Sequence, residues 1–101
     1  MRLKRSPSPL QELRELGKFL AEQRTRAGLT QRDVARRLGY TTPQFVSNWE
    51  RGVALPPLSD LPLITSLYNL QPEEVIDRVV ELQRASYEDQ LNELRRMLQA
   101  G

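Results

Sequence analysis

The sequence predicts an all-α fold of five helices, the last of which forms an extended C-terminal helix. Helix starts are marked by capping residues, as at Thr30 and at the dipeptide Ser8-Pro9, and helix ends by glycine or asparagine. Between these signals apolar residues recur at helical spacing, and no segment shows the alternation typical of a strand. Capping and periodicity together therefore indicate the fold class.

The helices are expected at 9–27, 31–38, 43–51, from a Ser59 cap to residue 68, and from 72 to 98. Pro62 is compatible with the fourth helix because it falls in the first turn. The expected core residues share helical spacing on these segments: Leu13, Leu16, Phe19, Leu20, Val34, Ala35, Leu38, Val46, Trp49, Leu61, Ile64, Leu67, Tyr68, Val75, Ile76, Val79 and Val80.

The segment from 29 to 52 holds two short helices joined by a tight turn. Thr30 and Asp33 have the spacing of a capping box, and Gly39 can end the first helix in the left-handed conformation. Thr42 is a suitable N-cap for the second helix, with Pro43 at its first position. Helices joined so closely must cross steeply, which is the shape of a helix-turn-helix whose second helix enters the DNA major groove.

Composition excludes several classes of function. The chain has no cysteine and no histidine, which excludes disulfides, thiol chemistry and the common zinc sites. We therefore expect no enzyme activity, no cofactor and no metal. No apolar run approaches the roughly 20 residues of a membrane span, and no signal-peptide pattern follows the basic start. The expected location is the cytoplasm, at the nucleoid.

Charge is distributed unevenly along the chain. Residues 1–59 carry 11 basic and 5 acidic side chains, whereas residues 60–101 carry 4 basic and 8 acidic ones. The basic half contains the paired helices, as DNA binding requires, because neutralised phosphates supply much of the affinity. A solvated surface alone would also account for such an imbalance.

Three regions are expected: a flexible basic arm at 1–8, a DNA-binding domain at 9–80 with its helix-turn-helix at 30–51, and a C-terminal helical extension at 81–101. The extension carries apolar residues at heptad spacing, interrupted by Arg84: Val80, Tyr87, Leu91, Leu94 and Leu98. This stripe spans too few heptads to establish a coiled coil. It either folds back on its own domain or forms a dimer seam, and no remaining segment is available to cover it.

Four motifs in order resemble the XRE family of phage-repressor and Cro-type helix-turn-helix proteins. They are Ala27–Gln31, the pair Val34-Ala35 with Leu38-Gly39, Trp49–Gly52, and Leu67–Glu74. The resemblance covers roughly residues 16–76. It implies a lambda-repressor-like DNA-binding domain with helix 43–51 in the major groove.

The resemblance implies DNA contacts from Gln31, Arg32, Thr42, Gln44, Phe45, Ser47, Asn48 and Arg51. Gln44 and Asn48 lie one helical turn apart, and each amide can bind adenine through two hydrogen bonds. Phe45 either touches a thymine methyl or packs internally. The family pattern also pairs Arg24 with Glu50 in a structural ion pair that fixes the angle of the recognition helix.

The chain departs from the family pattern at two places. One extra residue lies between Gly39 and Gly52, and we expect it in the turn at Tyr40-Thr41. The loop 53–57 has no Lys or Arg to hold phosphate. Other basic residues would have to compensate: Arg32, Arg36 or Arg37, Arg51, and Arg2, Lys4 and Arg5 of the arm.

The sequence thus favours a sequence-specific DNA-binding regulator, with a repressor as the expected form, acting as a homodimer on a palindromic site in double-stranded DNA. The alternative is an antitoxin-like module that autoregulates its operon. Its acidic C-terminal helix, with Glu81, Glu88, Asp89 and Glu93, would bind a basic protein partner. Neither hypothesis involves a membrane.

Overall fold

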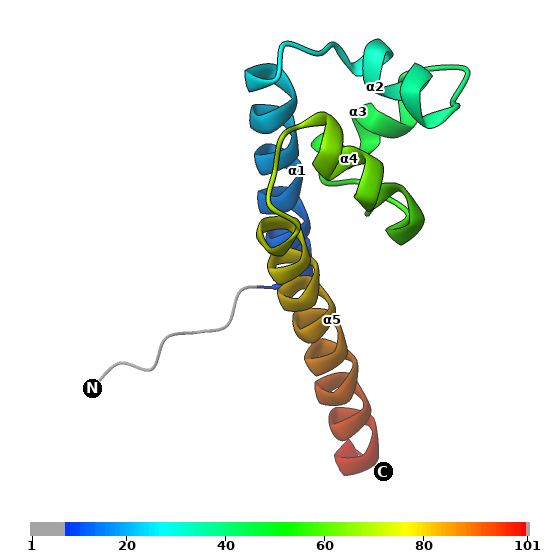
Figure 1. The fold of residues 1–101 in the computed structure, drawn as a ribbon. Coiled ribbons are helices and arrows are strands. Elements are labelled where there is room, and N and C mark those ends of the chain that lie inside the picture. Colours follow the sequence, from blue (N-terminus) through cyan, green and yellow to red (C-terminus); the bar gives the residue numbers. More distant parts are fainter. Residues whose placement is uncertain (1–7, 101) are drawn as a thin grey trace.

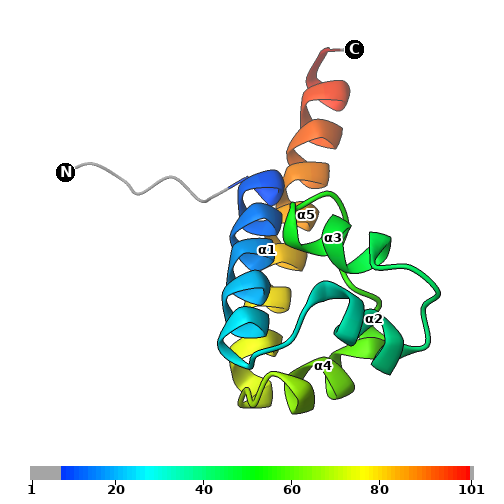
Figure 2. The ribbon, with the colours of Figure 1, turned by 90° about the horizontal axis from the view of Figure 1, so that it is seen from above.

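Two long helices, α1 (Pro9–Arg26) and α5 (Pro72–Ala100), lie side by side, and three shorter helices form a cluster beside them (Figures 1 and 2). Two of the shorter helices contact the long pair, and the third packs mainly on those two. The shorter ones are α2 (Gln31–Leu38), α3 (Gln44–Glu50) and α4 (Leu61–Leu67), and a 3-10 turn, η1 (Leu58–Asp60), precedes α4. This computed structural model describes residues 8–100. Within that range all regular structure is helical, so the predicted fold class is confirmed. The expected arm, with Arg2, Lys4 and Arg5, lies outside the described residues apart from Ser8.

Most helix boundaries follow the predicted caps. The Ser8 hydroxyl accepts a hydrogen bond from the backbone N–H of Gln11 at 3.1 Å. Thr30 and Asp33 form the complete capping box, with bonds of 3.0 and 2.8 Å, and these bonds lower the pKa of the Asp33 carboxyl. The helix stops have positive φ as expected: 78° at Gly28, 86° at Gly39, 73° at Gly52 and 56° at Asn69.

Two predicted starts are wrong. The Pro43 carbonyl accepts the first intrahelical bond of α3 from Ser47 at 3.0 Å, so Pro43 precedes the helix and α3 begins at Gln44. Thr42 still accepts a hydrogen bond from the Gln44 N–H at 3.3 Å. Ser59 does not cap α4, because it lies inside η1 and α4 begins at Leu61.

The core lies between α1, α5 and the three short helices. It consists of the buried apolar residues Leu16, Leu20, Val34, Ala35, Val46, Trp49, Ile64, Tyr68, Val75, Val79 and Leu82. The predicted core residues Ile76 and Val80 are instead 52% and 46% exposed, while Leu82 was not predicted and is buried. Because the buried positions of α5 recur every three to four residues from Val75, the residues one position later point away from α1.

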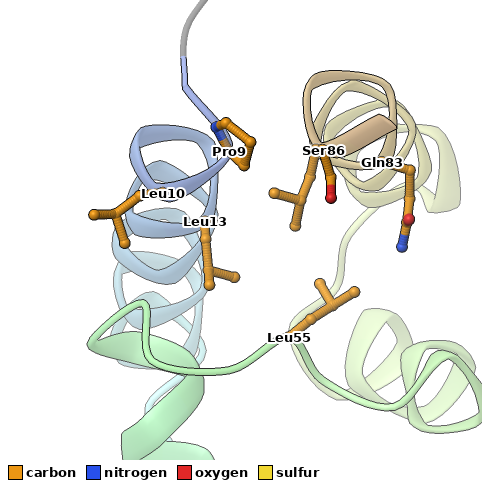
Figure 3. A pocket seen from close by; sticks show the side chains of 7 residues that line it. Pro9, Leu10, Leu13, Leu55, Gln83 and Ser86 are labelled. Atoms are coloured by element: carbon orange, nitrogen blue, oxygen red, sulfur yellow. The ribbon is translucent and has the colours of Figure 1, made fainter. Parts of the chain in front are cut away.

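The loop after α3 closes the end of the core between α1 and α5. Pro56 is buried, and Leu55 lines a pocket of about 280 Å³ together with Leu13 of α1 and Leu82 of α5 (Figure 3). The apolar residues Leu55 and Pro56 of this loop are therefore explained by packing. A basic residue at Leu55 would place a charge against apolar side chains.

Beyond Ser86, α5 leaves the rest of the domain and projects into solvent (Figure 1). All described residues from Tyr87 to Ala100 are exposed. The alternative in which the stripe folds back on its own domain is therefore wrong. Packing continues to Leu82 and the half-buried Ser86, somewhat past the expected domain boundary at 80.

Candidate nucleic-acid interface

Burial of one side of α3 determines which side chains face outward. Val46 and Trp49 are 0% and 3% exposed and form part of the core. Since residues three to four positions apart share a helix face, the opposite face carries Gln44, Asn48 and Arg51. The first and last of these are exposed and Asn48 is half-buried.

The outward side chains of α3 are hydrogen-bonded to one another. The Gln44 amide donates to Asn48 Oδ1 at 2.9 Å, and the Arg51 guanidinium donates to the same oxygen at 2.6 Å. These two bonds use the Gln44 NH₂ group and the Asn48 oxygen, so neither involves the Asn48 NH₂ group or the Gln44 amide oxygen. A donor and an acceptor on one exposed helix face match the hydrogen-bonding edge that adenine presents in the major groove.

Tyr40 fixes the turn between α2 and α3, a role that the sequence interpretation missed. Its hydroxyl donates to Asp60 Oδ2 at 2.5 Å, which raises the pKa of Tyr40. Its ring lies 4.9 Å from the Phe45 ring and 6.0 Å from the Trp49 ring, measured between centroids. Tyr40 thus anchors the turn to the domain, and an aromatic residue within a predicted turn was the available signal.

Phe45 is partly packed and partly exposed. Its ring packs on Tyr40, yet the residue remains 53% exposed beside the outward face of α3. An exposed aromatic edge is available for an apolar contact such as a thymine methyl. Ser47, on the other flank of that face, is half-buried.

Arg24 and Glu50 form an ion pair that joins α1 to the end of α3. Arg24 Nε lies 2.6 Å from Glu50 Oε2, a second guanidinium nitrogen lies 3.0 Å from Oε1, and the third donates to the Leu29 carbonyl at 2.8 Å. The two side chains are 16% and 7% exposed. Hydrogen bonding to Glu50 raises the pKa of Arg24, which favours the charged guanidinium.

Gln31 belongs to the same network. Its side-chain amide donates to Glu50 Oε1 at 2.9 Å, which ties the start of α2 to the end of α3. The sequence interpretation placed Gln31 at the DNA. In the structure its amide nitrogen points inward and binds the Glu50 carboxylate. The resemblance implies only Arg24 as a partner of Glu50.

Gly17 is a second residue that the sequence interpretation missed. A Cβ atom at this position would lie 2.5 Å from the Trp49 carbonyl oxygen and 2.6 Å from that of Glu50. Glycine therefore allows α1 to approach the C-terminal end of α3 directly. A glycine inside a predicted helix, next to the core residue Leu16, was the signal for such a close contact.

Basic side chains surround the turn on the α2 side. Arg32, Arg36 and Arg37 are all exposed. The first two, with Thr41 and Thr42, line a hollow of about 300 Å³ between α2 and the turn. The structure thus places guanidinium groups and threonine hydroxyls around the turn that precedes α3.

The comparison with protein-family models decides the classification. A model described as a helix-turn-helix domain matches residues 15–78, which covers α2 to α4 and parts of α1 and α5. The chain belongs to this helix-turn-helix family. The family is part of the XRE-like group, so the resemblance to Cro-type proteins is confirmed. It indicates a DNA-binding regulator and is typically non-enzymatic.

Searches of the curated proteins and of the solved structures gave no significant match. Among residues 8–100, no helix is both long enough and apolar enough to cross a membrane.

Proposed function

We propose that this helix-turn-helix protein is a sequence-specific transcriptional repressor that binds a palindromic operator as a homodimer. The observation that supports base reading most directly is the hydrogen-bonded outward face of α3, with Gln44, Asn48 and Arg51. Polar side chains on an exposed helix of a helix-turn-helix are positioned to contact base edges in the major groove. The protein would act in the cytoplasm, at the nucleoid.

The proposed phosphate contacts flank this face. Arg32, Arg36 and Arg37 of α2 would contact the backbone on one side, with the Thr42 hydroxyl nearby. Ser47 would reach a phosphate from α3. Such contacts hold the register of the recognition helix, while discrimination between sequences comes from Gln44, Asn48 and the exposed edge of Phe45.

Homodimer formation supplies the specificity that one short helix lacks. An α3 of 7 residues contacts few base pairs, and a two-fold dimer doubles the number read. The exposed apolar stripe on α5 provides a surface for that association. An antitoxin-like function, in which the same exposed helix binds a basic protein, is the second proposal, and Glu88, Asp89 and Glu93 are exposed for it.

Selection of bound duplexes from a random DNA pool tests the proposal. We expect enrichment of a palindromic motif whose half-sites lie about one helical turn apart. Arg32, Arg36 and Arg37 of α2 and Arg51 directly after α3 are exposed, so two copies offer about eight phosphate contacts. Affinity should therefore fall about 10³–10⁵-fold between roughly 50 and 200 mM salt. Failure to enrich any sequence, or binding that ignores salt, would contradict the proposed function.

A further inference from the structure

From Val80 onward, α5 carries an apolar stripe that faces away from its own domain. Its exposed fractions are 46% at Val80, 63% at Tyr87, 41% at Leu91, 50% at Leu94 and 75% at Leu98. With Arg84 these residues form a row spaced alternately by four and three residues, which we call the seam. By the helical period the seam lies on the side of α5 opposite Val75, Val79 and Leu82, which pack toward α1.

We propose that the seam pairs with a second copy of this chain in an antiparallel orientation centred on residue 89. This inference rests on the proposed homodimer and adds the orientation and register of its two helices. Both follow from the charges on and beside the seam.

A parallel arrangement would oppose like charges in the seam. In parallel coiled coils each seam residue faces its own copy, so Arg84 would face Arg84. The flanking positions would bring Gln83 opposite Glu88 and Gln90 opposite Arg95, and neither pair joins opposite charges. A parallel pair therefore contains one like-charge layer and no opposite-charge contact between the two copies. Arg84 has only the Glu81 carboxylate of its own chain, 3.3 Å away, to offset the repulsion.

The antiparallel register removes that repulsion. Leu98 then faces Val80 of the second copy, and Leu91 faces Tyr87. Arg84 faces Leu94, against which its aliphatic stem can pack while the guanidinium group reaches water. Every layer from 80 to 98 thus contains at least one apolar side chain.

The flanking charges favour the same register. Glu81 lies on the same flank of the seam as Arg95, and in the antiparallel pair each faces the other at both ends of the contact. Glu88 faces its own copy at the centre, which is one like-charge contact at an exposed flanking position. Two opposite-charge pairs against one like-charge pair leave a net attraction.

The resulting spacing fits the proposed DNA site. At 1.5 Å per residue, Val79 would lie about 30 Å from its copy along the helix axis, and Val75 about 42 Å from its copy. These residues anchor α5 to the two DNA-binding bodies. Half-sites one turn apart are separated by about 34 Å.

Engineered disulfides distinguish the two orientations, and the natural chain has no cysteine that would interfere. Chains carrying Val80→Cys and chains carrying Leu98→Cys are mixed in a glutathione redox buffer and analysed by mass spectrometry. We expect the mixed disulfide to dominate, because each of these positions lies about 27 Å from its own copy. Val53→Cys, on an exposed residue outside the seam, is the control for random cross-linking. If Val80→Cys chains instead cross-link to one another, and Leu98→Cys chains do the same, the antiparallel register is wrong.

A charge exchange tests the ionic contacts by sedimentation equilibrium. Arg95→Glu should weaken self-association at least tenfold, because the new carboxylate would face Glu81 of the second copy at each end of the contact. Adding Glu81→Arg to the same chain should restore association. A wild-type chain that stays monomeric would overturn this inference and leave the seam to a different protein.

Binding of one operator half-site separates this inference from the proposed function. The seam lies away from α3, so Arg95→Glu should bind a half-site as wild type does. If the cysteine variants bind a half-site but do not form the mixed disulfide, the antiparallel register is wrong and the proposed function stands. Absence of DNA binding by the wild type would instead contradict the proposed function, whatever the disulfide pattern.

Discussion

Replacement of Arg24 by alanine is expected to destabilise the domain by about 3–5 kcal/mol. The Glu50 carboxylate, 7% exposed, would lose two hydrogen bonds from Arg24 and retain the one from Gln31. The Leu29 carbonyl would also lose its guanidinium donor. An uncompensated charge at a buried site is expensive, so the loss should exceed that of a surface ion pair.

Chemical denaturation of the Arg24→Ala chain measures this effect. Arg26→Ala is a matched control, since it removes an exposed arginine from the same helix. A double variant, Arg24→Met with Glu50→Leu, should recover much of the stability because neither charge is then buried alone. If Arg24→Ala and Arg26→Ala unfold at the same denaturant concentration, the ion pair does not stabilise the angle of α3.

Gly17→Ala is expected to destabilise the domain by about 1–3 kcal/mol. Alanine normally favours a helix over glycine by roughly 0.5–1 kcal/mol, so helix propensity alone predicts the opposite sign. The new Cβ atom would lie 2.5 and 2.6 Å from two backbone carbonyl oxygens of α3. Because backbone atoms cannot rotate away, α1 and α3 would have to separate.

Thermal unfolding of Gly17→Ala, with Lys18→Ala on the adjacent exposed position as control, measures the sign directly. The same shift should weaken DNA binding, because it displaces the recognition helix relative to the rest of the domain. A Gly17→Ala chain more stable than wild type would show that α1 and α3 do not require their close approach.

Local signals in the sequence were sufficient for most of the fold. Thr30, Asp33, Gly39 and Asn69 act through their own backbone neighbours, and their roles agree with the prediction. Capping chemistry depends on residues three or four positions away, so the sequence displays it directly.

The features that the sequence does not predict arise where distant segments meet. Tyr40 bonds to Asp60 and Gln31 to Glu50, contacts that span 20 and 19 positions and have no periodic signature. Gly17 is defined by the backbone of another helix. The placement of Ile76 depended on the rotation of α5 about its axis, which packing against α1 decides. These features become visible only when the helices are assembled.

If the outward face of α3 reads bases, Gln44→Ala should lose the base discrimination that this side chain supplies. Once the operator is selected, the affinities of wild type and Gln44→Ala are compared on a panel that substitutes each base pair in turn. Arg36→Ala serves as the phosphate-contact control. We predict that Gln44→Ala loses discrimination of about 1–3 kcal/mol at one base pair of each half-site, whereas Arg36→Ala weakens binding uniformly. A Gln44→Ala profile parallel to that of wild type at every position would contradict base reading by α3.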